Sequence, residues 1–280
     1  ADQHLLIEGA HPSQRRLAFE ELLAHHLTLL KLRKTIQQDG APALAHTKHY
    51  TAPFLAALPF QLTQAQQRVS QEVAQDLSAP LPMLRLVQGD VGSGKTLVAA
   101  LAALTVIEAS HQVALMAPTE ILAEQHANNF KAWFEPLGIN VTWLAGKTKA
   151  AERKLALASI ASGEAKMIVG THAVFQDDVN YHNLAFVIID EQHRFGVHQR
   201  LSLREKGAFD NKYPHQLIMT ATPIPRTLAM TAYADLDTSI IDELPPGRTP
   251  IKTIALPDDR RDEVIERIRQ TCENENRQAY

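Results

Sequence analysis

Residues 89–96 read Gly89-Asp90-Val91-Gly92-Ser93-Gly94-Lys95-Thr96, which matches the pattern GxxxxGK[ST]. In loops of this pattern, glycines allow backbone conformations that a Cβ would forbid, and several N–H groups converge on the phosphates of a nucleotide. The lysine reaches the β- and γ-phosphates, and the final hydroxyl ligates Mg²⁺. The sequence therefore predicts a cofactor site formed by all eight residues, in which Lys95 is catalytic and Thr96 holds the metal.

The segments on both sides of this loop support the interpretation. Residues 84–87 form an apolar run typical of a buried strand, and residues 97–109 are rich in Ala, Leu and Val, as in a buried helix. A helix that begins directly after the loop turns its positive N-terminal end toward the phosphates. Strand, loop and helix together predict a site for a nucleoside triphosphate with Mg²⁺.

The middle of the chain alternates between apolar runs and helical segments of ten to twenty residues. The run Phe186-Val187-Ile188-Ile189 is apolar on both faces, which is typical of a parallel sheet covered by helices on each side. The fold class is therefore predicted as α/β, with a doubly wound parallel sheet. The predicted strands are 84–88, 113–117, 141–145, 166–169, 185–189 and 216–219.

The two ends of the chain depart from this alternation. Residues 14–34 predict a long amphipathic helix, and the prolines, glycine and small polar residues of 37–53 predict a linker. After Ile241 the pattern restarts, with a predicted strand at 251–256, a helix at 259–272 and the opening of another strand at 278–280. One such unit cannot close a core, so we expect the chain to stop inside a second domain.

Composition excludes several classes of protein. The 280 residues are 45% hydrophobic and 21% charged, as in globular proteins, and no apolar run approaches the roughly 18–20 residues that a membrane span needs. A single cysteine, Cys272, excludes an internal disulfide framework and fits a reducing cytoplasm. The net charge of −3 gives no electrostatic argument for nucleic acid, so any such function must be argued from motifs.

An acidic pair follows the apolar run at 186–189. Asp190 and Glu191 stand at the carboxyl end of the predicted strand, where a doubly wound sheet presents ligand-binding groups. Asp190 is placed to hold the Mg²⁺ shell, and Glu191 is placed to orient and deprotonate an attacking water. Both are predicted catalytic residues.

Three further segments follow predicted strands and carry small or hydroxylated residues: Thr119, Gly170 with Thr171, and Thr220 with Thr222. Such residues cap helices, and the same exposed N–H and hydroxyl groups also bind phosphates. Three of them on one edge of a sheet suggest a track for a polyanion, because half or more of the hydrogen bonds to nucleic acid go to phosphate and sugar.

A segment before the loop offers two interpretations. Thr63 and Gln66 fit a capping box, in which the Gln66 side chain reaches back to the Thr63 N–H. Alternatively, the Gln66 amide pairs with the edges of adenine. Phe60, just before this pair, is a further candidate for the nucleotide site.

The order of these motifs resembles that of superfamily 2 helicases and nucleic-acid translocases. Two longer strings, at 190–200 and 220–228, and the string Glu-Leu-Pro-Pro-Gly-Arg at 243–248 resemble the RecG family of bacterial double-stranded DNA translocases, which remodel stalled forks. The resemblance implies an ATP-dependent DNA helicase with a RecA-like fold: 54–245 is the first motor domain, 1–53 is a linker helix and connector that follows an absent wedge domain, and 246–280 is the truncated start of a second lobe.

The resemblance also implies roles and partners. Gln66 becomes the adenine reader, Thr119, Gly170 and Thr171 become candidate contacts to the DNA backbone, and His193, Thr220 and Thr222 couple the γ-phosphate site to the DNA. Phe195 is either an aromatic coupling element or a buried loop anchor. The implied cofactors are ATP and Mg²⁺. The implied protein is a monomer in the cytoplasm, associated with the nucleoid, that acts on forks and Holliday junctions, with single-strand-binding protein as a further partner.

Two alternatives compete with this interpretation. The transcription-repair coupling translocase shares much of both strings, but that family typically has Phe at the position of Ser93 and Glu at the position of Gln192. A nucleotide-binding scaffold that never hydrolyses ATP need not keep a water-activating acid, so Glu191 argues against it. The arginine finger of the RecG family belongs to the second lobe, so we expect this chain alone to be nearly inactive.

Overall fold

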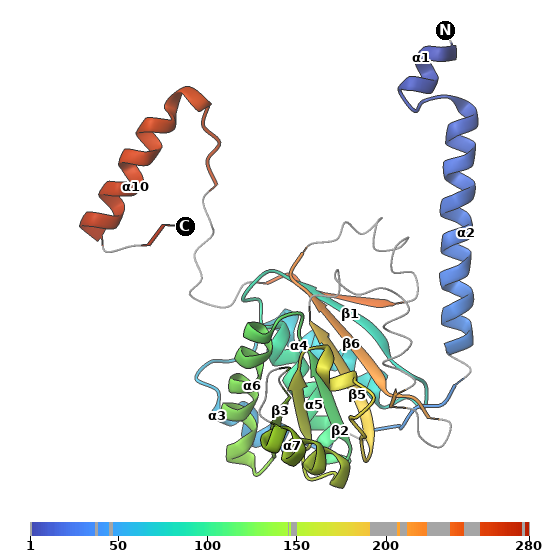
Figure 1. The fold of residues 1–280 in the computed structure, drawn as a ribbon, viewed down its shortest axis with the longest axis vertical. Coiled ribbons are helices and arrows are strands. Elements are labelled where there is room, and N and C mark those ends of the chain that lie inside the picture. The colour runs from blue at the N-terminus through green and yellow to red at the C-terminus, as the bar shows by residue number, and fades with distance from the viewer. Residues whose placement is uncertain are drawn as a thin grey trace. The chain divides into compact units, whose positions relative to one another are not determined.

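The fold was analysed in a computed structural model of the chain (Figure 1). The structure describes residues 2–36, 39–44, 47–144, 146, 150–190, 206–207, 212–222, 236–243, 253–275 and 278–279. Contacts within the chain separate two compact units, Ala1–Pro245 and Pro246–Tyr280.

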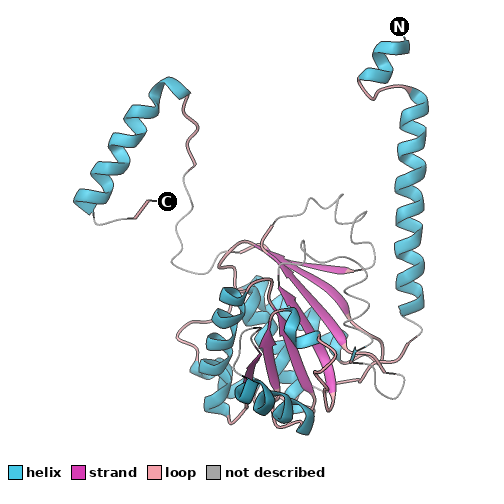
Figure 2. Ribbon diagram, in the orientation of Figure 1, coloured by secondary structure: helices cyan, strands magenta, loops and turns pink. Residues whose placement is uncertain are grey.

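The first unit contains all of the strands and most of the helices in the described part of the chain (Figure 2). Its elements are α1 (Asp2–Ile7), α2 (Pro12–Ile36), α3 (Thr51–Ala57), α4 (Gln64–Leu77), β1 (Leu84–Gly89), α5 (Lys95–Glu108), β2 (Gln112–Met116), α6 (Glu120–Phe134), η1 (Glu135–Leu137), β3 (Val141–Leu144), α7 (Ala150–Ser162), β4 (Met167–Gly170), η2 (His172–Phe175), β5 (Leu184–Asp190), β6 (His215–Thr220) and β7 (Asp237–Ile241).

The strands form one sheet of seven, in the order β3-β4-β2-β5-β6-β1-β7, and every pair of neighbours is parallel. The carboxyl ends of all the strands therefore meet at one edge. β6 lies between β1 and β5, so the strand that leads into the glycine-rich loop is separated from the strand that ends at Asp190 by a single strand. The predicted α/β fold with a doubly wound parallel sheet is confirmed.

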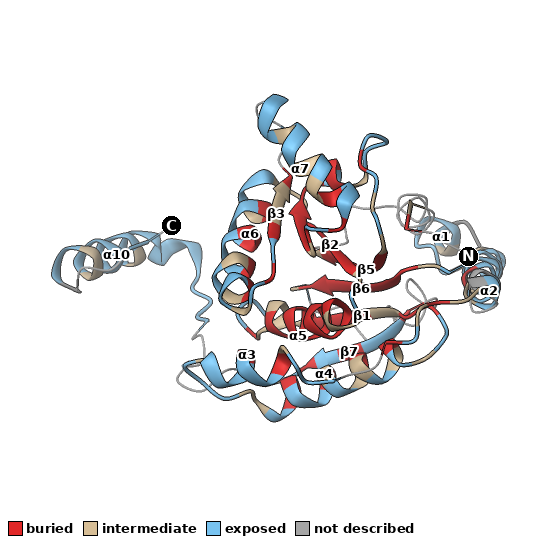
Figure 3. Ribbon diagram, turned by 90° about the horizontal axis from the view of Figure 1, so that it is seen from below, coloured by how far each residue is buried: buried red, intermediate tan, exposed pale blue. Residues whose placement is uncertain are grey.

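Both faces of the sheet are covered, as the continuous apolar runs of its strands require. Alternate strand residues point to opposite faces. Val87, Val113 and Ile188 belong to the cluster that packs against α4, α5 and α6, whereas their neighbours Leu86 and Ala114 belong to the cluster that includes Ile160 of α7 and the residues of η2. Figure 3 shows the central strands and α5 as the most buried elements.

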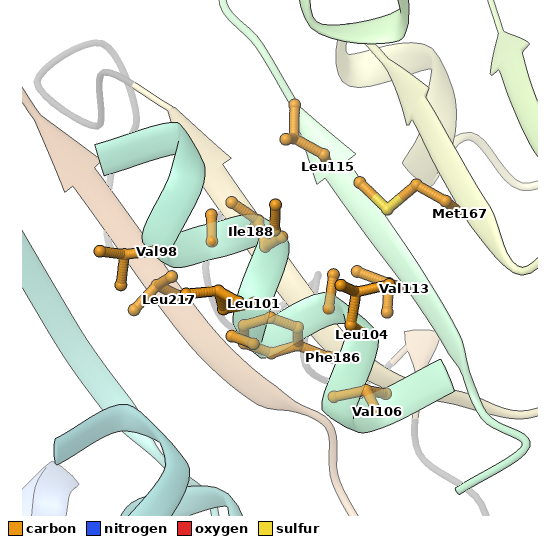
Figure 4. Packing of buried hydrophobic residues seen from close by; sticks show 14 of the residues in the cluster. Val98, Leu101, Leu104, Val106, Val113, Leu115, Met167, Phe186, Ile188 and Leu217 are labelled. Atoms are coloured by element: carbon orange, nitrogen blue, oxygen red, sulfur yellow. The ribbon is translucent and has the colours of Figure 1, made fainter. Parts of the chain in front are cut away.

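Helix α5 is apolar around its whole circumference and is buried from Leu97 to Ile107. Figure 4 shows Val98, Leu101 and Leu104 of this helix among Phe186 and other side chains of the sheet. Because close packing holds α5 from all sides, its first turn and the loop before it have a fixed position relative to the sheet.

The six predicted strands are confirmed, with bounds that differ by at most a few residues, and so are the long helix near the N-terminus, now α2, and the helix after the glycine-rich loop. The strand β7 was not predicted. The segment 37–53 was predicted to be a linker, but its last residues begin α3, at Thr51.

The second unit contains η4 (Asp258–Arg260) and α10 (Arg261–Glu275), which confirms the predicted helix at 259–272. The predicted strand at 251–256 is wrong for its described part, because residues 253–257 form neither strand nor helix. Residues 278–279 likewise form no strand. A strand needs a neighbour that accepts and donates its backbone hydrogen bonds, and the described residues of this unit offer none.

Among the described residues, no helix is both long and apolar enough to span a lipid bilayer.

Candidate nucleotide-binding site

The glycine-rich loop connects the carboxyl end of β1 to the first residue of α5. Gly92 and Gly94 have φ angles of 79° and 91°, a region that side chains with a Cβ rarely adopt, and Gly94 is the N-cap of α5. The Lys95 Nζ donates to the Gly89 carbonyl over 2.7 Å and to the Asp90 carbonyl over 3.1 Å. The ammonium is thus held against the backbone at the start of the loop.

Close packing against the side chains of Ser93 and Gln66 fixes the loop. A Cβ on Gly89 would overlap the Ser93 hydroxyl, and a Cβ on Gly94 would overlap the Gln66 amide. The Ser93 N–H donates to the Asp90 carbonyl over 3.0 Å, and the Val91 N–H donates to the Asp90 carboxylate over 2.8 Å. The loop therefore needs glycine at both of these positions to keep its shape.

Gln66 joins α4 to this loop. Its carbonyl oxygen accepts from the Thr63 N–H over 3.0 Å while the Thr63 hydroxyl accepts from the Gln66 N–H, so the predicted capping box is confirmed. The same side chain donates from Nε2 to the Ser93 carbonyl over 2.8 Å, and the residue is only 3% exposed. Its role as adenine reader stays a prediction. Phe60 lies nearby in sequence and is half exposed, as a ring that stacks on a base would need to be.

Asp190 ends β5 at the same edge of the sheet. Its carboxylate oxygen Oδ2 lies 2.6 Å from Nε2 of His126, which is buried in the middle of α6. The two side chains are 13% and 10% exposed. Three sequence-predicted residues that follow Asp190 lie outside the described residues: Glu191, His193 and Phe195.

Thr220 and Thr222 lie between the loop and Asp190. Thr220 pairs with Gln88 of β1, and its neighbour Met219 pairs with Asp190 of β5. The two threonine hydroxyls are 2.8 Å apart, and the Gln88 side chain donates to the Thr222 carbonyl over 3.4 Å. The structure thus brings these two threonines into contact with β1, the strand that leads into the glycine-rich loop.

The donor groups at this edge suit Mg²⁺, which prefers hard oxygen ligands and retains several waters. Thr96 is half-buried in the first turn of α5. Among the described residues, Asp190 is held through Oδ2 alone, so Oδ1 is the oxygen that could face a metal or its water. A hydroxyl and a carboxylate oxygen on neighbouring parts of one sheet edge fit the ion that accompanies a nucleotide.

The remaining sequence-predicted residues lie at the other strand ends. Thr119 is the N-cap of α6, and its hydroxyl accepts from the Leu122 N–H over 3.3 Å, which confirms its capping role. Thr171 is buried, without a side-chain cap bond to η2. Gly170 has no room for a side chain, because a Cβ would overlap the Leu144 carbonyl oxygen. Contact of these residues with DNA stays a prediction.

The first turn of α4 is also attached to the segment that follows β7. The Glu243 carboxylate accepts from the Ala65 N–H over 2.9 Å, and Arg68 donates both to the Ile240 carbonyl and to the Asp242 carboxylate over 2.9 Å. The hydrogen bond from Arg68 lowers the pKa of Asp242 below its usual value. A carboxylate at a helix N-terminus is also favoured by the helix dipole.

Two contacts of the site were missed in the sequence. His126 lies on the buried face of α6, together with Ala123, Ala127 and Phe130. A histidine on the apolar face of a helix indicates that a polar partner lies near it, because buried polar groups form hydrogen bonds. The sequence alone contains this signal. The contact of Glu243 with α4 joins residues 178 positions apart, so no local sequence pattern predicts it.

The family model for DEAD/DEAH box helicase matches residues 63–231. ATP-dependent DNA helicase RecG of Pasteurella multocida (strain Pm70) is 66% identical over 98% of this chain, and RecG of Haemophilus influenzae is 64% identical over 99%. The chain spans 40% of the length of each of these two relatives.

A solved structure, that of RecG bound to a three-way DNA junction, has a TM-score of 0.82 and 42% sequence identity with this chain. The match covers 95% of this chain and 35% of that one. These similarities confirm the resemblance to the RecG family that the motifs indicated, and they agree with the RecA-like character of the sheet.

Proposed function

Because the chain belongs to the DEAD/DEAH box helicase family, we propose that it is the ATP-binding motor lobe of a translocase that remodels branched double-stranded DNA in recombination and repair. The observation that carries this proposal is the match over 95% of the chain to RecG bound to a three-way DNA junction. The identities to RecG relatives favour it over a transcription-repair coupling translocase and over a scaffold that does not hydrolyse ATP.

At the nucleotide, Lys95 leaves the loop carbonyls and pairs with the β- and γ-phosphates, while the loop N–H groups surround them. Thr96 and Asp190 hold Mg²⁺, which supplies positive charge to the phosphates when bound. Glu191 takes a proton from the attacking water. Gln66 reads the adenine with Phe60 beside it, and its bond to Ser93 ties base recognition to the phosphate loop.

At the DNA, the groups at the ends of β2 and β4 meet the phosphate backbone. Thr119, Gly170 and Thr171 contribute hydroxyl and N–H groups, as expected for contacts that position a duplex without reading its sequence. His193, Thr220 and Thr222 couple these contacts to the γ-phosphate. The bond between Gln88 and the Thr222 carbonyl supports this coupling, because it joins the threonines to the strand that ends in the phosphate loop.

The proposed substrates, partners, location and domain bounds are those that the resemblance to the RecG family implies. The substrates are forks and Holliday junctions, single-strand-binding protein is a further partner, and the protein acts as a monomer in the cytoplasm, associated with the nucleoid. Residues 54–245 form the first motor domain, 1–53 a linker helix and connector, and 246–280 the start of the second lobe. An arginine finger of the second lobe completes the nucleotide site, as the resemblance implies.

The test is ATP hydrolysis by the intact protein that carries these residues, with three-way junction DNA and with linear duplex. We expect the junction to stimulate hydrolysis more than the duplex does, and Lys95→Ala to abolish both Mg-ATP binding and hydrolysis. Lys154→Ala, on the exposed face of α7, is the matched control and should leave both unchanged. Equal stimulation by the two DNAs, or Mg-ATP binding by the Lys95 variant at wild-type affinity, would contradict the proposal.

A further inference from the structure

His126 occupies an unusual position for a polar side chain. It lies in the middle of α6 and is 7% exposed, between Ala123 and Ala127 on the face that packs on the sheet. Burial of an imidazole on such a face is unfavourable unless the ring has a hydrogen-bond partner. The partner is Asp190, whose Oδ2 lies 2.6 Å from the ring Nε2.

The surroundings of the ring indicate which atom donates. His126 Nδ1 is buried and has no hydrogen-bond partner in the described part of the chain. A proton on Nδ1 would therefore be a buried donor without an acceptor, whereas a bare Nδ1 loses less by being unpaired. The arrangement that fits both nitrogens has a proton on Nε2, which is donated to the Asp190 carboxylate.

We propose that His126 is a positioning residue, which orients the carboxylate of Asp190 so that Oδ1 faces Mg²⁺. The inference rests on the proposed function, because it takes Asp190 as a metal ligand. A carboxylate at a strand end rotates about its side-chain bonds, and the metal gains affinity when a neighbouring donor fixes one oxygen. Asp190 is 13% exposed in its side chain, so water is a poor substitute for His126 in this role.

The position of His126 has a second consequence for the site. The same helix begins at the N-cap Thr119, which is a candidate contact to DNA, and His126 lies about 10 Å further along the helix axis. α6 therefore joins the proposed DNA track to the proposed metal ligand through one rigid element. A small displacement of this helix changes the direction in which the Asp190 carboxylate is held.

The inference is tested by the binding of Mn²⁺, followed by electron paramagnetic resonance, to the intact protein with saturating ADP. His126→Leu removes the donor and replaces the ring with an apolar side chain of similar size. We expect this variant to weaken Mn²⁺ binding by about 10- to 100-fold. His126→Gln, whose amide replaces the Nε2–H, should recover most of this loss. Phe130→Leu, a buried change on the same face of α6, controls for a general loss of packing and should bind Mn²⁺ as wild type does.

A double-mutant cycle separates positioning from other effects. In an Asp190→Asn background, His126→Leu should have no further effect on Mn²⁺ binding, because the group that it orients is already changed. The inference is overturned if His126→Leu binds Mn²⁺ within about twofold of wild type, or if Phe130→Leu loses as much affinity as His126→Leu. If wild type itself binds no Mn²⁺ with nucleotide, the proposed nucleotide site is refuted and this inference with it.

Discussion

Gln66 uses one side chain for two structural bonds, and both have to be considered before a role in base recognition is tested. Its carbonyl oxygen completes the cap of α4, and its amide nitrogen holds the Ser93 carbonyl of the phosphate loop. Any substitution at this position therefore alters helix stability and loop position together. Thr63 offers a way to separate the two, because its hydroxyl takes part in the cap and, among the described residues, makes no hydrogen bond to the loop.

We expect Gln66→Ala and Thr63→Ala to lower the free energy of unfolding by similar amounts, each about 1 kcal/mol from the lost cap. Only Gln66→Ala should also lower the affinity for ATP, because only this change frees the Ser93 carbonyl. If Gln66 reads adenine as well, its variant should in addition lose the preference for ATP over GTP. Thermal unfolding and competition between ATP and GTP measure these effects.

Equal ATP affinity of the two variants would show that the bond to Ser93 has no influence on the loop. An unchanged preference for ATP in Gln66→Ala would leave Gln66 with its capping and loop contacts and remove the adenine role.

At the scale of elements, α3 and α5 are joined end to end by one carboxylate. Glu108, the last residue of α5, accepts from the N–H groups of Thr47, Tyr50 and Thr51 and from the Thr47 hydroxyl. A negative charge at the C-terminus of its own helix is unfavourable, but the N-terminus of α3 compensates for it. Partial burial raises the pKa of Glu108, and these hydrogen bonds outweigh that effect, so the pKa is lowered overall from its ordinary value of 4.5.

The lowered pKa predicts how stability depends on pH. Because the folded state binds the proton of Glu108 less tightly than the unfolded state does, this stabilisation is complete above pH 4.5 and is lost as the pH falls through the lower folded value. We expect Glu108→Gln to destabilise the fold by about 1–3 kcal/mol at pH 7. The difference from wild type should shrink below pH 4.5 in urea unfolding measured at several pH values.

Glu164→Gln is a suitable control, because Glu164 is exposed and, in the described part of the chain, its carboxylate accepts no hydrogen bond from α3. It should follow wild type at every pH. A difference between Glu108→Gln and wild type that stays constant from pH 7 to pH 3.5 would show that the charge of Glu108 does not carry the contact.

The sequence predicted the elements whose own residues determine them. Four of the predicted strands, β2, β4, β5 and β6, are largely apolar runs that are buried along almost their whole length, and the glycine-rich loop follows from its glycines and Lys95. β7 was missed because it is an edge strand in which only Ser239 and Ile241 are buried, so no apolar run marks it. Bonds such as Gln66 to Ser93 and His126 to Asp190 depend on how distant segments pack, which local patterns do not determine.

At the scale of the whole molecule, the weak charge of the chain limits how it holds DNA. The net charge is −3, and the candidate contacts Thr119, Gly170 and Thr171 are hydroxyl and backbone groups. Such contacts displace few counterions from DNA, in contrast to a surface of lysines and arginines. Counterion release should therefore contribute little to the affinity of this chain for DNA.

We expect the isolated 280-residue chain to bind DNA weakly and without preference for forks. The logarithm of its affinity should fall with the logarithm of salt concentration at a slope of about −2 to −3, as for two or three displaced ions. Fluorescence anisotropy on forked and linear DNA, across a salt series, measures both quantities. Submicromolar, fork-selective binding would show that the described lobe itself recognises the branch.

The attachment of the segment after β7 to α4 has a mechanical consequence. The Glu243 carboxylate accepts from the Ala65 N–H, and Arg68 donates to Asp242. Gln66, the residue after Ala65, donates to the Ser93 carbonyl. A pulling force applied to the chain beyond Glu243 therefore reaches the phosphate loop through a single helical turn, before it strains the pairing of β7 with β1. Tension on that segment would therefore change the position of the loop, and with it the affinity of the loop for a ligand.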